Sequence, residues 1–235
     1  MRHPALQVSG LASGYKSSMV LRDLSLTVGK GEALALLGKN GMGKSTLLKS
    51  IMGFLPKKQG AVHLDGQDIS RLPPHRISRA GMAYAAQEQA LFTDLSVRDN
   101  LSLGLESEKT FEERFEPVLA LFPVFGSRLG QYAGSLSGGE QKMLLVARTL
   151  MARPQVMLFD EITEGLQPSV VQAIGEALKW ERKQRGTAML IVEQNVAFAL
   201  AVADRYVVLK QGQVIDEGSA GAAHATSRIL DHLRV

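Results

Sequence analysis

The sequence predicts an α/β fold in which helices cover a parallel sheet, and three observations predict it. Short apolar runs that suit buried strands alternate with segments of helical periodicity. One run, residues 33–37, leads into a glycine-rich loop of the pattern G-x-x-x-x-G-K-[ST], and helical spacing begins directly after it. A later run, residues 156–159, ends in two adjacent acids, and ligands bind at such carboxyl ends of parallel strands.

The N-terminal part of the chain predicts antiparallel strands that flank this loop. Its short alternating segments are residues 5–11, 19–21 and 24–28, closed by the turn Gly29-Lys30-Gly31. A second hairpin follows the first helix, with residues 61–64 turning at Asp65-Gly66. We therefore expect an antiparallel β subdomain beside the parallel sheet.

The loop G-K-N-G-M-G-K-S-T predicts binding of a polyphosphate between the strand 33–37 and a helix over 45–52. Glycines let consecutive N–H groups turn inward, and the helix N-terminus adds partial positive charge. Lys44 brings a full charge to the β and γ phosphates, and the Ser45 hydroxyl can ligate Mg²⁺. A glycine-rich turn that matches by chance is the alternative. The candidate ATP-binding residues are Gly38, Asn40, Gly41, Gly43, Lys44, Ser45 and Thr46.

The remaining elements follow in order. A strand over 81–86 ends at Gln87, and a helical block follows with periodic segments at 97–103, 111–122 and 141–151, separated by Pro123 and a turn region at 134–139. After the strand 156–159, we expect a helix from Pro168 to near Gly186, a strand over 188–192, a hairpin of 205–209 with 213–217, and a helix from Thr226.

Asp160 and Glu161 directly follow the strand 156–159 and suggest a division of labour between two acids. Asp160 can hold Mg²⁺ through water, and Glu161 can orient or deprotonate the attacking water. A helix N-cap followed by a solvated acid is the alternative. The phosphate loop upstream favours the metal and base roles.

The run L-S-G-G-E-Q at 136–141 is the second glycine-rich stretch that precedes a predicted helix, so it predicts another cluster of N–H donors. A helix-capping loop is the alternative. Placed between the phosphate loop and the Asp160-Glu161 strand, the run resembles the signature of ABC-type ATPases, and the resemblance covers nearly the whole chain. It implies one nucleotide-binding domain over 1–235, with a P-loop NTPase (RecA-like) parallel-sheet core, the antiparallel β subdomain and a helical signature subdomain at about 88–150.

The resemblance also implies roles for single residues. Two such domains pack head to tail, so Ser137 and Gly139 of one would contact the γ-phosphate held by Lys44 of the other, and Gly138 between them would belong to the same nucleotide-binding set. Tyr15 would stack on adenine, although a merely packed tyrosine is the alternative. Gln87 would reach Mg²⁺ and the lytic water, with Gln89 as the alternative register. Gln194 stands at the position of a γ-phosphate contact.

Three positions depart from the usual pattern of the family. Most members have a histidine where this chain has Gln194, and glutamine can donate a hydrogen bond but carries no proton charge near neutral pH. None of the five histidines lies in this segment, so we expect slower hydrolysis or greater reliance on Glu161. Gln167 replaces the aspartate of the inter-subunit loop, and Ile162 replaces a common proline.

Two short runs narrow the resemblance without settling it. The segment V-E-Q-N at 192–195, together with L-S-G-G-E-Q, is similar to the short ATPase subunits of branched-chain amino-acid importers. The runs T-E-G-L-Q-P at 163–168 and L-P-P-H-R at 72–76 look more like the urea and short-chain amide branch. The transported substrate is chosen by other subunits, so both remain open.

Composition limits the partners. The formal charge of +4 lacks the concentrated basic stripe of nucleic-acid binders, so we expect no nucleic acid. The chain has no cysteine, shows no secretory signal and contains no apolar run near the length that spans a bilayer.

The resemblance implies a cytoplasmic ATPase that uses ATP and Mg²⁺ and lies on the inner face of the membrane through permease subunits. Its partners would be a second ATPase subunit, in a homodimer or heterodimer, and indirectly a solute-binding protein. The alternatives are a nucleotide-gated regulatory subunit with little hydrolysis and a soluble ABC ATPase acting on DNA or ribosomes. Members of that last class usually carry coiled-coil insertions or a second cassette, which this chain lacks.

Overall fold

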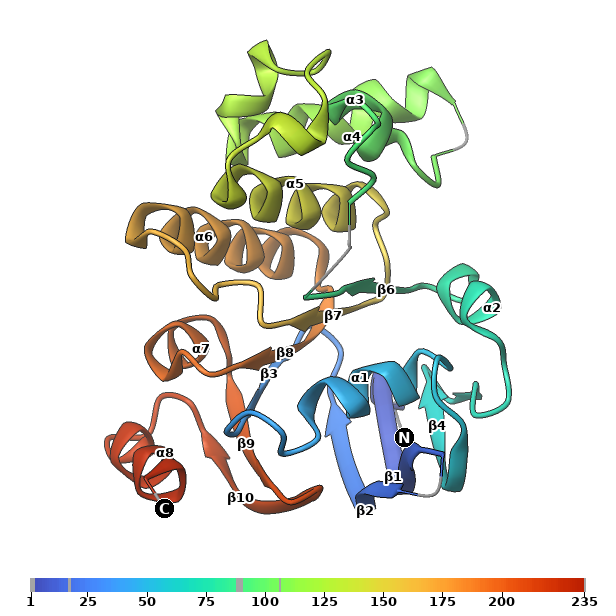
Figure 1. Cartoon of the computed structure of the whole chain (residues 1–235), viewed down its shortest axis with the longest axis vertical. Coiled ribbons are helices and arrows are strands. Elements are labelled where there is room, and N and C mark those ends of the chain that lie inside the picture. Colours follow the sequence, from blue (N-terminus) through green and yellow to red (C-terminus); the bar gives the residue numbers. More distant parts are fainter. Residues whose placement is uncertain (1–2, 17, 88–90, 106, 235) are drawn as a thin grey trace.

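The computed structural model describes residues 3–16, 18–87, 91–105 and 107–234, and its larger sheet has six strands in the order β10-β9-β3-β8-β7-β6 (Figure 1). All neighbouring strands are parallel except β10, which is antiparallel to β9. The strands are β3 (Ala33–Leu37), β6 (Met82–Ala85), β7 (Val156–Asp160), β8 (Ala188–Glu193), β9 (Arg205–Lys210) and β10 (Gln213–Ser219). The predicted parallel sheet and C-terminal hairpin are confirmed.

The second sheet is antiparallel, with the order β2-β1-β4-β5. Its strands are β1 (Leu6–Tyr15), β2 (Ser18–Val28), β4 (Lys57–Leu64) and β5 (Gln67–Asp68). The prediction of separate strands at 19–21 and 24–28 is wrong, because β2 is one strand that pairs with β1 across several register shifts. These irregularities interrupt the alternation that would otherwise have predicted one long strand.

The parallel sheet is apolar on both faces because each face packs against a different layer. Leu158 of β7 joins the core shared with α1 (Lys44–Ile51) and the antiparallel sheet. Its neighbours Met157 and Phe159 point to the opposite face, toward α5 (Gly138–Met151) and α6 (Pro168–Arg185). Helix α1 therefore lies between the two sheets, and the phosphate loop at its start lies at the carboxyl edge of the parallel strands.

The middle of the chain is helical, as predicted, and forms the layer above α5 in Figure 1. It contains α3 (Val97–Ser102), α4 (Glu108–Leu121) and the short 3₁₀ helices η1 (Pro123–Ser127) and η2 (Ala133–Ser135). Phe111, Phe115 and Phe125 fill its core. Helix α8 (Ala225–Leu233) packs beside β10 near the C-terminus.

Two short helices were not predicted. They are α2 (Pro74–Arg79) and α7 (Val196–Val202), with six and seven residues. Neither spans two full turns, so apolar periodicity carries little signal there. Asn195 does cap α7 by accepting a hydrogen bond from the Phe198 N–H, which is a recognisable start signal.

None of the helices in the described part of the chain combines the length and the apolar character that crossing a bilayer requires.

Candidate nucleotide-hydrolysis site

The phosphate loop presents the start of α1 without a side-chain cap. Gly43 occupies the N-cap position with φ of 102°, a backbone conformation that residues with a side chain rarely adopt, and among the described residues no side-chain capping hydrogen bond is formed there. The first N–H groups of a helix have no intrahelical partner, and they carry partial positive charge. This helix start is therefore available to an anion.

Lys44 is almost fully buried and its ammonium group is held inside the loop. Its Nζ donates to the carbonyl oxygens of Gly38 and Lys39, at 2.8 and 3.0 Å. It also lies 3.0 Å from Oε1 of Glu161, and each of these two residues is only 4% exposed. The predicted phosphate ligand and the predicted base thus form a buried ion pair.

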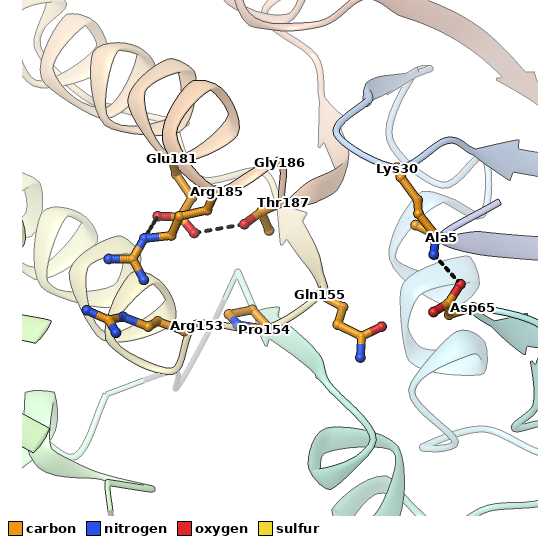
Figure 2. Close-up of a pocket in the computed structure, with 10 residues that line it drawn as sticks. All are labelled: Ala5, Lys30, Asp65, Arg153, Pro154, Gln155, Glu181, Arg185, Gly186 and Thr187. Carbon is orange, nitrogen blue, oxygen red and sulfur yellow. Dashed lines mark hydrogen bonds and ion pairs between the residues drawn. The ribbon is translucent and has the colours of Figure 1, made fainter. Parts of the chain in front are cut away.

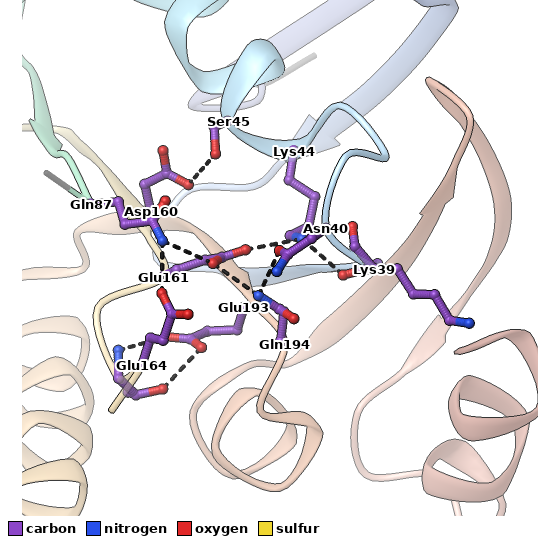
Figure 3. Close-up of polar contacts among 12 residues, drawn as sticks. Lys39, Asn40, Lys44, Ser45, Gln87, Asp160, Glu161, Glu164, Glu193 and Gln194 are labelled. Atoms are coloured by element: carbon purple, nitrogen blue, oxygen red, sulfur yellow. Dashed lines mark hydrogen bonds and ion pairs between the residues drawn. The ribbon is translucent and has the colours of Figure 1, made fainter. Parts of the chain in front are cut away.

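Glu161 is the point where the predicted residues converge (Figure 3). Its Oε2 accepts hydrogen bonds from the Gln87 side chain at 3.2 Å and from the Gln194 side chain at 3.0 Å. The backbone of Glu161 has φ of +50°, which is strained for a residue other than glycine, and its N–H donates to the Val192 carbonyl. The amides come from the ends of β6 and β8, so three neighbouring strands deliver this cluster.

Asp160 is buried between two hydroxyl groups. Ser45 Oγ donates to one carboxylate oxygen and Tyr84 Oη to the other, each at 2.9 Å. Burial raises the pKa of Asp160, and these two hydrogen bonds oppose that increase. A hydroxyl and a carboxylate side by side are hard oxygen donors, so Ser45 and Asp160 fit a Mg²⁺ site that substrate phosphates and water complete.

The amide of Gln194 also reaches the phosphate loop, where Nε2 lies 2.8 Å from Oδ1 of Asn40. Gln87 additionally donates to Glu164 at 2.7 Å. The alternative residue Gln89 lies outside the described residues. Gln87 and Gln194 therefore bracket one carboxylate, and neither can change its charge near neutral pH.

A hollow of about 470 Å³ brings the predicted nucleotide-binding residues together. Tyr15 lines it with 46% of its surface exposed, so it is not buried in the core, and its stacking on adenine stays a prediction. The lining residues are Tyr15, Val20, Asn40, Gly41, Gly43, Lys44, Ser45, Thr46, Gln87 and Glu161.

The signature residues Ser137, Gly138 and Gly139 do not join this hollow. They line a second one of about 440 Å³, together with residues of the loop that follows Glu161. The predicted helix start at Gln141 is wrong, because α5 begins at Gly138 and Ser137 caps it. The Ser137 hydroxyl accepts from the Glu140 N–H and donates to the Glu140 carboxylate, so both glycines lie within the first turn. Gly138 has open space where a side chain would stand.

A larger hollow of about 550 Å³ lies at the opposite edge of the parallel sheet, where the strands begin (Figure 2). Gln155 precedes β7 and Thr187 precedes β8 there. Its buried Glu181 accepts from Thr187 and pairs with Arg185, and Lys30 pairs with Asp65. Glu181 and Arg185, and Lys30 and Asp65, are thus paired with each other, and we expect the chemistry at the other edge.

Three side chains near the site were missed from the sequence. Tyr84 lies on β6, three residues before Gln87, and donates a hydrogen bond to Asp160. Lys142 of α5 donates to the Gln87 carbonyl at 2.9 Å. Glu193 accepts hydrogen bonds from Thr163. For Tyr84 and Glu193, a polar residue within an apolar strand was the available signal, but single-sequence patterns do not identify its partner, and Lys142 on α5 gave no such signal.

Glu193 is 2% exposed, and burial raises its pKa from 4.5 to about 7 against the hydrogen bonds from Thr163. Because the folded state holds the proton more tightly, this group's stabilising contribution is complete below pH 4.5 and is lost as the pH rises through 7. Between pH 5 and 8, the free energy of unfolding should fall by about 2–3 kcal/mol more in the parent than in Glu193→Gln.

Urea unfolding at the two pH values measures this difference. The exposed Glu176→Gln serves as a matched control and should follow the parent. An equal pH dependence in the parent and Glu193→Gln would contradict the assignment of a raised Glu193 pKa.

The fold and the uncapped phosphate loop define a nucleotide-binding protein of the P-loop class. The family described as ABC transporter matches residues 21–164. The branched-chain amino acid transport ATP-binding protein BraG of Pseudomonas aeruginosa is 34% identical over 228 residues, covering 96% of this chain and 97% of the relative.

The lipopolysaccharide export ATP-binding protein LptB of Escherichia coli is 38% identical over 221 residues, covering 91% of this chain and 90% of the relative. A solved nucleotide-free ATP-binding cassette from an ABC transporter superposes with a TM-score of 0.86 at 25% identity, covering 97% and 96% of the two chains. The chain belongs to the ABC transporter family, as an ATP-binding subunit that hydrolyses ATP.

Proposed function

We propose that this subunit hydrolyses ATP with Glu161 as the general base and thereby powers an importer of branched-chain amino acids. The observation that carries the proposal is the convergence of Lys44, Gln87 and Gln194 on the buried Glu161 carboxylate. A carboxylate beside two neutral amides and one lysine can orient a water molecule and accept its proton.

The substrate ATP would lie in the hollow above α1, with adenine on Tyr15. The phosphates would meet the backbone N–H groups of the loop and the Lys44 ammonium, which is bound to two carbonyl oxygens and Glu161 in the described conformation. Ser45, Asp160 and Gln87 would hold Mg²⁺, which neutralises charge on the phosphates when bound. Phosphate binding to Lys44 would weaken the ion pair and leave Glu161 to face the attacking water.

Gln194 would take the position of the usual histidine and donate its amide to the γ-phosphate. Its present partners, Asn40 of the loop and Glu161, support that placement, since they lie on either side of the expected phosphate. Because an amide adds no charge, the stabilisation of the transferring group would rest on Lys44 and Mg²⁺.

A second subunit would complete the site. Ser137, Gly138 and Gly139 line a different hollow from Lys44, so they would contact the ATP of a partner subunit rather than their own. ATP that contacts both faces only in the closed pair shifts the population toward that pair. The subunit would work in the cytoplasm, docked on permease subunits at the inner face of the membrane, with a solute-binding protein as an indirect partner.

The transported substrate is inferred from a relative's name and from two short sequence runs, which favour different candidates. BraG, named for branched-chain amino acid transport, matches nearly the whole chain, and this supports the amino-acid assignment. The T-E-G-L-Q-P and L-P-P-H-R runs favour urea or a short-chain amide as the second candidate. LptB, named for lipopolysaccharide export, is equally related, so the direction of transport needs its own test.

Reconstitution with the co-purified membrane subunits decides the cargo. We expect uptake of labelled leucine into vesicles that depends on ATP at the face carrying this subunit, with labelled urea left outside. Uptake of urea instead of leucine would support the second candidate. Outward movement of either solute would contradict an importer.

A further inference from the structure

One buried carboxylate, at the end of β8, joins that strand to the loop after β7, and the two residues in contact lie 30 positions apart in the sequence. Oε1 of Glu193 accepts from the Thr163 N–H at 3.1 Å, and Oε2 accepts from the Thr163 hydroxyl at 2.9 Å. Glu193 is 2% exposed and Thr163 is 5% exposed, so water does not compete for these bonds. Both carboxylate oxygens thus accept hydrogen bonds from a single residue.

The position of this contact follows from the end of the sheet. β7 and β8 pair up to Asp160 and Val192, and the Glu161 N–H then donates to the Val192 carbonyl. Beyond that bond, the chain after β7 leaves the sheet. The Glu193–Thr163 contact comes next and fastens the departing segment to the last residue of β8, directly before Gln194.

The segment between these two attachments contains Glu161 in its left-handed conformation. A strained backbone persists only where its surroundings over-determine it. Val192 holds the N–H of Glu161 itself, and Glu193 holds the segment two residues beyond, at Thr163. The same strand carries Gln194, whose amide lies 3.0 Å from the Glu161 carboxylate.

We propose that Glu193 is a positioning residue, which fixes the Glu161 carboxylate relative to Gln194 by binding Thr163. This inference rests on the proposed role of Glu161 as the base. Glu193 itself does not touch the hollow that would hold ATP, so it acts through the loop.

The energetics favour a positioning role over simple packing. A carboxylate in this core is costly to bury, and its raised pKa reports that cost. An apolar residue would fill the same space more favourably but could not accept two hydrogen bonds from one residue. The two bonds fix both the distance and the orientation of the loop.

The first test uses Thr163→Val, which keeps the size and branching of the side chain and removes the hydroxyl. Displacement of a catalytic group by about 1 Å can reduce the rate 100-fold, and we expect the loss of one of two bonds to lower kcat about 10-fold. KM for ATP should stay within about twofold, because the loop that binds phosphate is untouched. Thr163→Ser restores the hydroxyl and should recover kcat.

The second test is a double-mutant cycle of Thr163→Val, Glu193→Met and the double variant. The kcat of each is measured at a temperature below its unfolding transition. Because both single changes break the same contact, the double variant should lose little more than the worse single variant. Unchanged kcat in Thr163→Val, no recovery in Thr163→Ser, or multiplying losses in the cycle would each overturn the positioning role.

Glu161→Gln in the parent background is the reference for the proposed function. If that variant turns over ATP at the parent rate, the base assignment has failed. If it is inactive while Thr163→Val remains fully active, only the role of Glu193 has failed.

Discussion

Replacing Glu161 with glutamine should lower kcat for ATP hydrolysis by about 10²–10⁴-fold, the usual contribution of a positioned general base. Glutamine keeps the size of the side chain and can still accept hydrogen bonds, but it cannot take a proton from water. The measurement is phosphate release at saturating Mg²⁺ and ATP. Glu217→Gln, an exposed acid on β10, is the matched control and should retain the parent rate.

The same variant should bind ATP at least as tightly as the parent. In the parent, the γ-phosphate must compete with Glu161 for Lys44, because the two side chains form a buried ion pair at 3.0 Å. Glu161→Gln removes that competition and leaves Lys44 buried without its counter-ion, which destabilises the free subunit by about 3–5 kcal/mol. Fluorescent nucleotide titration and thermal unfolding with and without ATP measure both effects.

Loss of hydrolysis should also trap a dimer of two ATPase subunits. With Mg²⁺ and ATP, Glu161→Gln should associate with itself or with a sister subunit, because the nucleotide stays bound between Lys44 and the partner's signature residues. Light scattering measures the mass. Turnover at the parent rate would show that Glu161 is not the base. If the inactive variant stays monomeric with ATP and every sister subunit, ATP is not held between two subunits.

Sequence patterns were sufficient for the residues that bind through their backbone or follow a strand. The phosphate loop has a defined spacing because backbone N–H groups and the helix start do the binding, so Gly43 and Lys44 could be placed by pattern alone. Asp160 and Glu161 follow a buried strand, and parallel strands put their carboxyl ends at one edge. The approach of Gln87 and Gln194 to Glu161 follows from the same geometry.

Contacts between side chains from distant parts of the chain could not be predicted from the sequence. The pairing of Lys44 with Glu161 joins the start of α1 to the end of β7, and the pairing of Glu193 with Thr163 joins the end of β8 to the loop after β7. No local periodicity encodes either contact. The start of α5 was misplaced because glycines argue against a helix, whereas the reciprocal Ser137 and Glu140 bonds compensate for them. That pair matches the capping-box pattern and could have corrected the prediction.

The second large effect concerns Lys44. Lys44→Ala should raise the Kd for ATP by about 100-fold or more, since losing charge-assisted hydrogen bonds to phosphate costs about 3 kcal/mol. The same change leaves Glu161 buried without a counter-ion and the Gly38 and Lys39 carbonyls without their donor. Loss of binding could therefore reflect a destabilised fold, so the single variant alone does not separate the two causes.

The double variant Lys44→Ala/Glu161→Gln separates folding from binding. Removing both charges together relieves the unpaired carboxylate, so the free energy of unfolding should recover toward the parent value. ATP affinity should remain as weak as in Lys44→Ala, because the phosphate still lacks its ammonium partner. Lys183→Ala, an exposed lysine near the end of α6, controls for the loss of a positive charge. If the double variant regained both stability and ATP affinity, the phosphate would be held by the backbone of the loop alone, and Lys44 would serve only to neutralise Glu161.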